Sequence, residues 1–520
     1  MNYLRFLAAA AVATLLGLMW PLQTAAQEDT SGSPTLASAE QEPQSSSQSG
    51  PSTPSEQKSN SSEFSGVAIS GSLRGRAERW SWFEAPPGQS NYTFGALLLR
   101  VALHQKKERF EWMVEGISPW LMNLPAQAIL PAPQGQLGQG ANYYAANHNQ
   151  DGSAGFYQGF VKFKSLFGNA PSSFRLGRFE FSDGAEVKPS DATLAALKND
   201  RIQQRLIGPV GFSHIGRSFD GIHFDRTTER NNFTFFAARP VEGVYQLRSL
   251  YELDVDIFYA AFTRQLPSKR APSEFRLFAV EYHDGRPVLK VDNRPQAARV
   301  ADHYNIRITT FGGHYLAAIG SGAAKFDLLF WGAAQVGNWG VLTHRAGAIA
   351  IEAGHKFDAP MQPWLRAGYF RGSGDGSPND NEHSTFFQML PTPRIYARFP
   401  FFNMMNNQDI FGELLLKPVR KLSLRTDVHS LSLSNSHDLW YLGGGAYQQS
   451  TFGYTGRPGN SHSGLGTLFD GSLDYAITSK TTLTFYGGVV RGGSVEAAVY
   501  PQAGANPGSH FVYFEFLQRF

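Results

Sequence analysis

The chain of 520 residues carries 46 Lys plus Arg against 43 Asp plus Glu, a net charge of +3. This balance argues against a nucleic-acid-binding protein, whose contact surface is strongly basic. The sequence has no cysteine, which excludes disulfide bonds and thiolate metal sites, and its mean hydropathy of −0.29 argues against a bundle of membrane helices.

The first 64 residues predict a signal peptide followed by a disordered tether. MNYLR is positively charged, FLAAAAVATLLGLMW is apolar and PLQTAA supplies small residues, which together predict a signal peptide over residues 1–26. The alternative is an uncleaved anchor, but the apolar run is short for a membrane span and ends at Pro21. Residues 27–64 are rich in Ser, Pro, Gln and Glu and have little to bury, so we expect a disordered tether.

Residues 65–520 predict an all-β domain. Segments of about ten residues alternate apolar with polar or small side chains and are separated by turn residues. In Leu422–His429 the even-numbered residues are mostly apolar and the odd-numbered ones are polar. The last segment of the chain has an apolar face formed by Val512, Phe514, Phe516 and Phe520. A soluble β-sandwich also alternates, but this chain is too long for one sandwich and shows no domain boundary.

The connections between these segments are expected to alternate strictly between short and long. The short ones are 104–108, 167–172, 227–232, 267–273, 320–324, 357–362, 417–421 and 477–480. The long ones include 373–403 and 439–463. This arrangement is typical of barrels in the bacterial outer membrane, where only closure satisfies every backbone group of the strands. The pattern therefore predicts a transmembrane outer-membrane β-barrel of about 18 antiparallel strands, with both ends on the periplasmic side.

Two regions carry a resemblance to a known family. They are WLRAGYFRGSGDGSPNDNEHSTFFQMLP at 364–391 and IGPVGFSHIGRSFDGIHFD at 207–225, with GRFEFSDG just upstream of the second and a weaker third match in LSLSNSHDLWYLGGG. They resemble the bacterial alginate-export outer-membrane family. The resemblance implies an eighteen-stranded barrel that passes an acidic polysaccharide outward, an arginine-lined lumen with some acidic partners, and inward-folded loops. The terminal Phe520 resembles the assembly signal of outer-membrane barrels, although Gln518 departs from the usual aromatic residue near that end.

Two long segments, Pro119–Gly155 and Asp183–His214, are expected to restrict the pore, because structureless loops above about 12–15 residues are usually functional. The second contains a predicted helix in Ser190–Leu206, with Ser190 or Asp191 as its N-cap.

Alternation also assigns the charged strand residues to the lumen, because charge on the lipid face near the midplane costs about 2–4 kcal/mol for Arg or Lys. The basic residues assigned to the lumen are Arg74, Arg76, Arg100, Lys162, Arg175, Arg276, Arg307, Arg366 and Arg425. The acidic ones are Glu111, Glu115, Asp256, Asp327, Glu352, Glu413, Asp427, Asp470 and Asp474. The predicted substrate-binding residues of the pore are Arg74, Arg76, Arg100, Arg175, Arg366, Arg425 and Asp427. The alternative for most of these residues is a solvated, charge-paired wall.

Guanidinium groups suit a polyuronate because they stay charged and bind carboxylates bidentately. Interspersed acids keep such contacts weak enough for release. The sequence therefore favours an exporter of an anionic, alginate-like polysaccharide, with lipid and a periplasmic scaffold as further partners. The alternative is a diffusive porin for small acidic solutes or sugars.

Other chemistry is weaker in this sequence. The adjacent pairs Ser213-His214, Ser436-His437 and Ser461-His462 lie in no nucleophile motif, so no enzyme and no cofactor is expected. Asp375 and Asp380 supply oxygen ligands for a weak Ca²⁺ option, but their spacing does not fit an EF-hand and a polar surface loop is the alternative.

Overall fold

The computed structural model describes residues 66–166, 168, 171–392, 397–400 and 403–520. The predicted signal peptide and the predicted tether lie outside these residues. None of the helices in the described part of the chain is long and apolar enough to cross a membrane.

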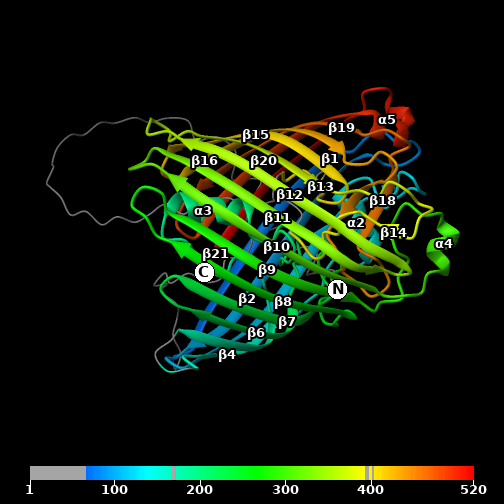
Figure 1. Ribbon diagram of the computed structural model, residues 1–520. Helices are drawn as coiled ribbons and strands as arrows, with labels where there is room; N and C mark the ends of the chain where they lie inside the picture. The colour runs from blue at the N-terminus through cyan, green and yellow to red at the C-terminus, as the bar shows by residue number, and fades with distance from the viewer. Residues whose placement is uncertain (1–65, 167, 169–170, 393–396, 401–402) are drawn as a thin grey trace, which may run out of the picture. The chain divides into compact units, whose positions relative to one another are not determined.

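Antiparallel strands close into a barrel, as predicted (Figure 1). The main sheet has nineteen strands, one of which is the two-residue β14 (Glu382–His383) added in parallel to β12, so eighteen strands form the wall. The wall strands are β1 (Ala68–Ser81), β2 (Asn91–Lys106), β3 (Phe110–Met122), β4 (Gly155–Lys164), β5 (Ser172–Phe179), β6 (Phe219–Thr227), β7 (Asn231–Pro240), β8 (Val255–Leu266), β9 (Ser273–Asp284), β10 (Ile306–Ile319), β11 (Lys325–Trp339), β12 (Leu342–Lys356), β13 (Trp364–Gly372), β15 (Asn407–Val419), β16 (Leu422–Leu433), β19 (Gly464–Ala476), β20 (Thr481–Gly492) and β21 (Gly508–Arg519).

The remaining elements belong to the long connections. They are α2 (Gln139–Asn147), α3 (Ala192–Arg201), α4 (Gln296–Ala301), the hairpin of β17 (Leu439–Gly443) and β18 (Tyr454–Pro458), α5 (Ser494–Val499) and the 3-10 helix η1 (Pro501–Ala503).

The barrel closes where β1 pairs with β21, from Ser72 opposite Arg519 to Ser81 opposite His510. Two backbone hydrogen bonds extend this seam: Gly71 N–H donates to Phe520 O at 3.1 Å, and Phe520 N–H donates to Gly71 O at 3.0 Å. Closure leaves no unpaired strand edge, which is the condition for a sheet in lipid.

The outer face of the wall is apolar. In β21, Phe514 is 42% exposed, whereas Phe511 and Tyr513 point inward and are buried. The same alternation exposes Leu277 of β9 and Phe469 of β19. The large exposed apolar side chains of the strands therefore form a surface suited to lipid tails, as the sequence pattern predicts.

One connection corrects the expected strict alternation of loop lengths. All eight predicted short turns lie at one rim, but β11 and β12 are joined at the other rim by Gly340–Val341 alone. Both strands have fifteen residues and stay paired up to Trp339 and Leu342. Gly340 has φ +63°, the left-handed conformation that a two-residue hairpin turn requires. A long strand pair thus replaces a loop in this sector.

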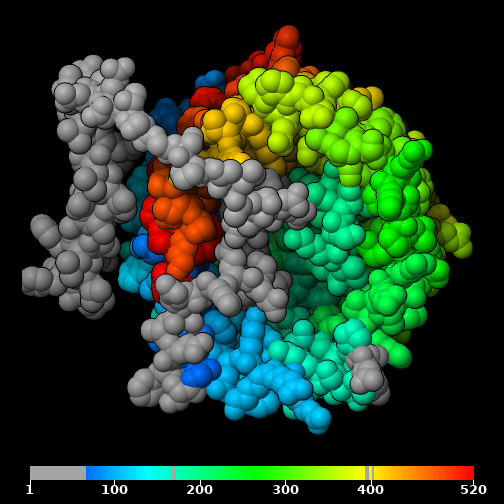
Figure 2. Space-filling view, turned by 90° about the vertical axis from the view of Figure 1, so that its left-hand side faces the viewer, coloured from blue at the N-terminus to red at the C-terminus, as the bar shows by residue number. Residues whose placement is uncertain are grey.

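The β5–β6 loop, residues 180–218, enters the barrel. Its helix α3 packs against β10 and β11, and Figure 2 shows teal atoms of this part of the chain inside the ring of strands. Asp191 caps the helix by accepting the backbone N–H groups of Thr193 and Leu194, as predicted, although the helix ends at Arg201 rather than Leu206. This places a folded segment where an open porin would have water.

We predict that Gly71→Ala weakens barrel closure. A Cβ at this position would lie 2.5 Å from the Arg100 carbonyl oxygen and 2.5 Å from the Phe520 ring, and such overpacking costs about 1–3 kcal/mol. The folded, heat-modifiable band on a gel should decrease. Gly75→Ala is the matched control in the same strand, because its Cβ would meet only Leu97 Cδ1 at 3.6 Å. Equal folding of both variants would contradict the role of Gly71.

Candidate functional site

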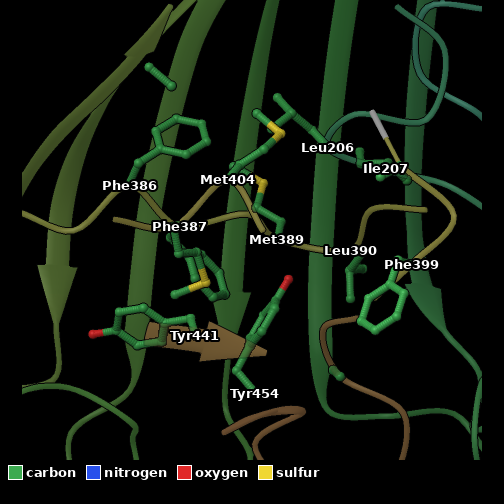
Figure 3. Close-up of a cluster of buried hydrophobic side chains, with 14 of the residues drawn as sticks. Leu206, Ile207, Phe386, Phe387, Met389, Leu390, Phe399, Met404, Tyr441 and Tyr454 are labelled. Carbon is green, nitrogen blue, oxygen red and sulfur yellow. The ribbon is translucent and has the colours of Figure 1, made fainter. Parts of the chain in front are cut away.

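An apolar cluster joins three long loops inside the barrel. Figure 3 shows Phe386, Phe387, Met389, Leu390, Phe399 and Met404 of the β13–β15 loop packed with Leu206 and Ile207 of the β5–β6 loop and with Tyr441 and Tyr454 of the β17–β18 hairpin. Backbone hydrogen bonds align the first two loops: Leu390 N–H donates to Leu206 O at 2.9 Å, and Gly208 N–H donates to Leu390 O at 2.8 Å. We call the three joined loops, in their described residues, the plug.

Arg217 holds the plug together. It is fully buried, and its two terminal nitrogens donate only to backbone carbonyls. The acceptors are Gly208 at 3.2 Å, Leu390 at 2.8 Å, Pro391 at 3.4 Å, Gly444 at 2.5 Å and Ala446 at 3.2 Å. Among the described residues no carboxylate lies within 4.0 Å of it. Burial lowers the pKa of Arg217 to about 10, so the side chain remains charged at neutral pH.

A charge network joins α3 to the inner wall. Arg201 of α3 lies 2.7 Å from Glu413 of β15, and Arg366 of β13 lies 2.9 Å from Glu352 of β12. Arg425 of β16 contacts Glu413 at 3.0 Å and also pairs with Asp427. The predicted residues Arg366, Arg425 and Asp427 therefore lie together on the inner face. Arg366 and Asp427 are buried, Arg425 is half-buried, and all three are already paired.

The predicted pair Arg74 and Arg76 contacts both the wall and the plug. Arg76 Nε donates to Glu515 Oε2 at 2.8 Å, and its Nη1 donates to the carbonyl of Phe212 at 2.9 Å. Arg74 donates to the carbonyls of Gly211, at 2.6 Å, and Ser213. Its carboxylate partner, Glu515, is 3.9 Å away. These arginines thus bind backbone oxygens of the β5–β6 loop.

Arg100 and Arg175 occupy different surroundings on the inner face. Arg100 is bound bidentately by Glu115, at 2.8 and 2.9 Å, and also contacts Glu180 at 3.0 Å. Arg175 lies over the ring of Phe179, 3.9 Å from its centroid, and has no carboxylate within 4.0 Å among the described residues. Arg100 is therefore neutralised, whereas Arg175 presents a half-buried cation.

Two residues assigned to the lumen were placed wrongly. Arg307 and Asp256 lie on the outer face at the long-loop rim, where Arg307 pairs with Glu281 at 2.6 Å and Asp256 pairs with Arg239 at 2.7 Å. The assignment assumed that charged strand residues face the lumen. That assumption fails at the long-loop rim, because the outer face of the wall is itself polar beyond the lipid-facing band.

The two loops expected to restrict the pore meet each other. The backbone N–H of His214, in the β5–β6 loop, donates to the Tyr143 hydroxyl of α2 at 3.1 Å. The sequence interpretation missed the other partners of the plug: the β13–β15 loop, the β17–β18 hairpin and Arg217. The Arg217 segment was visible only as part of a family motif, since nothing in its spacing reveals contacts to distant backbone atoms.

Hydrogen bonds engage four of the weaker sequence candidates. His214 Nε2 lies 2.9 Å from Glu78, while Ser213 Oγ accepts the backbone N–H of Gly216 at 2.7 Å. Asp375 Oδ1 accepts the Ser377 N–H at 3.1 Å, and Asp380 Oδ1 accepts the N–H of Glu382 at 3.0 Å. No group of three or more His, Asp or Glu side chains that could hold a metal ion occurs among the described residues.

We predict that Arg217→Met opens the plug without unfolding the wall. The substitution removes hydrogen bonds from a charged donor, each worth about 1.5–3 kcal/mol. It leaves none of the wall carboxylates without its partner. Single-channel conductance in planar bilayers should rise relative to the native barrel. Arg248→Met, on an exposed loop residue, is the control and should leave conductance unchanged. A native-like conductance of the Arg217 variant would show that the plug does not depend on this residue.

Solved structures share the fold of this chain. Outer membrane protein OpdK from Pseudomonas aeruginosa superposes with a TM-score of 0.51 at 9% identity, covering 87% of this chain and 98% of its own. OccK9 (OpdG) of the same organism gives 0.52 at 11% identity, with coverages of 87% and 98%. OccAB3 of Acinetobacter baumannii gives 0.51 at 10% identity, with coverages of 87% and 99%. At such low identity these likenesses show the fold alone.

A family comparison covers most of the sequence. The model of the family described as alginate export matches residues 98–506, which include both sequence regions singled out above. No curated protein matches the chain. The protein is therefore a β-barrel of the bacterial outer membrane and belongs to the alginate export family.

Proposed function

We propose that this outer-membrane channel exports an anionic, alginate-like polysaccharide once the plug loops move. The transport path follows the arginines of the inner wall. The residues proposed to contact the polymer are Arg74, Arg76, Arg100, Arg175, Arg366, Arg425 and Asp427. The protein acts without catalysis, and a periplasmic scaffold that delivers the polymer is a further partner in this proposal.

The observation that carries the proposal is the bonding of Arg74 and Arg76. Their guanidinium groups donate to the carbonyl oxygens of Gly211, Phe212 and Ser213. Withdrawal of this loop segment would break these hydrogen bonds and leave Arg74 with only its 3.9 Å contact to Glu515, which is costly for a buried charged donor. A uronate carboxylate can replace the carbonyls and forms stronger, charge-assisted hydrogen bonds. Loop and substrate therefore compete for the same donors.

The paired residues of the wall have a second role in this scheme. Arg366 and Arg425 are held by Glu352, Glu413 and Asp427, so a passing carboxylate meets a network that is already close to neutral. Such a surface binds each sugar weakly, and conduction needs contacts weak enough to release. Arg175 of β5, which lacks a carboxylate partner among the described residues, supplies a stronger contact elsewhere on the inner wall.

A diffusive porin for small acidic solutes or sugars is the second candidate. The apolar cluster of the plug favours it, because a lumen filled by packed loops leaves less room for a polymer than for single solutes. The two functions differ in their response to chain length. A polymer channel should be blocked for longer times by longer oligouronates, whereas a solute porin should respond to the monomer and dimer alone.

We predict that Arg74→Gln combined with Arg175→Gln lowers anion selectivity. Glutamine at 74 still donates to the loop carbonyls, and Glu515 keeps its contact with Arg76, so no buried acid loses all of its partners. The reversal potential in a salt gradient should shift toward cations, and blocks by oligouronates should shorten.

The control is Arg307→Gln, which removes one positive charge from the outer face. It should leave both the reversal potential and the block times unchanged. If the double variant behaves like the native channel, these arginines do not line the path. A native channel that prefers cations would exclude the acidic-polymer function and favour the general porin.

A further inference from the structure

A cavity of about 80 Å³ lies among the long loops. A buried water needs about 10–15 Å³ by this measure, so the cavity has room for about five to eight waters, comparable to one sugar ring. Its lining comes from six different connections and mixes aromatic, amide, hydroxyl and guanidinium groups. Residues that define its chemistry are Trp82, Gln136, Asn142, Phe212, Tyr447 and Arg457.

Arg457 of β18 is the charged group of this cavity. It is 2% exposed, and its Nη2 donates to the carbonyls of Gln134 at 2.7 Å and Gln136 at 2.9 Å. Its Nε donates to the Tyr500 hydroxyl at 3.0 Å. Its Nη1 is buried and has no hydrogen-bond partner among the described residues, and no carboxylate of these residues lies within 4.0 Å of the side chain. A buried cation without a carboxylate partner favours an anionic acceptor beside it.

The remaining lining fits a carbohydrate. The Tyr447 ring supplies an aromatic surface, while the amides of Gln136 and Asn142 offer donors and acceptors for ring hydroxyls. Ligand pockets with a few polar groups that fix the orientation of an otherwise apolar contact have this composition.

We propose that this cavity is a subsite for a single carboxylate-bearing sugar residue, with Arg457 bound to the carboxylate and the aromatic and amide side chains around the ring. The proposal rests on the proposed function in assuming that the substrate is an acidic saccharide. It adds a binding site formed by the loops to the path along the inner wall.

The subsite adjoins the wall arginines through one loop segment. Val210, Phe212 and Ser213 line the cavity, and the carbonyls of Phe212 and Ser213 accept hydrogen bonds from Arg76 and Arg74. The same segment therefore lines the cavity and binds the wall through its backbone oxygens. A sugar in the cavity lies against the segment whose withdrawal would open the path.

The test is equilibrium binding to the full-length barrel folded in detergent, followed by tryptophan fluorescence, since Trp82 lines the cavity and Trp440 lies beside Arg457. The probes are a uronic-acid trisaccharide and the neutral trisaccharide of the corresponding hexose. We expect the native protein to prefer the acidic probe, and Arg457→Gln to weaken its binding about tenfold, the loss of one charge-assisted hydrogen bond, with little change for the neutral probe.

Arg286→Gln is the matched control, because Arg286 also holds backbone carbonyls of the β16–β19 loop, at Gln448, Thr451 and Phe452, but does not line the cavity. It should keep the preference for the acidic probe. If it loses that preference as fully as Arg457→Gln, the effect comes from loop disorder and the subsite is excluded. Equal binding of both probes by the native protein, or no binding of either, also overturns the proposal.

A second variant covers the case in which Arg457→Gln fails to fold. Asn142→Leu changes a half-buried lining residue and should weaken both probes; native-like binding of both would overturn the proposed location. Because binding is measured without conduction, a barrel that does not transport polymer can still bind the acidic probe. Failure of the subsite and failure of the proposed function are therefore separate results.

Discussion

The hydrogen-bonded seam between β1 and β21 is the constraint on which the rest of the structure depends. In lipid an unpaired backbone group costs several kcal/mol, so the sheet must close on itself and no wall strand can be interrupted at membrane depth. Gly71 meets Phe520 at the end of this seam, where only a residue without a side chain leaves room for the terminal ring. The outer face is then committed to apolar contacts. Polar and charged side chains are therefore placed on the inner face and in the loops.

The loops form a second apolar core inside the barrel. The plug buries phenylalanine, methionine and tyrosine side chains from three connections, while charged groups collect where the plug meets the wall. Breaking one partner of a buried ion pair typically costs 3–5 kcal/mol, because the other charge stays behind uncompensated. Arg366 and Arg425 are thus part of the architecture as much as of the path. Arg74 and Arg175 are the residues that can change partner at the smallest structural cost.

The strands of the wall could be predicted from the sequence, whereas the contacts within the plug could not. Period-two alternation and turn composition are local properties, so they predicted the strand number, the apolar face of β21 and the cap of α3. The rule failed at Arg307 and Asp256, where the outer surface is itself polar, and at Gly340–Val341, where strand length replaces a loop. Four of the five acceptors of Arg217 could not be predicted, because they are backbone oxygens more than 170 residues away in two other loops. It also could not be predicted that Arg201 of α3 shares Glu352 and Glu413 with Arg366 and Arg425, because the position of α3 inside the lumen leaves no trace in its own sequence.

The way Arg217 is bound also determines what evolution can alter around it. A carbonyl oxygen belongs to every residue type, so the side chains at Leu390, Ala446 and the other acceptor positions can change without loss of the hydrogen bonds, provided that the chain keeps its course. No compensating exchange is needed when one of these positions mutates. Methods that infer spatial proximity from correlated substitutions would therefore overlook the central contact of the plug, although a single arginine connects all three of its loops.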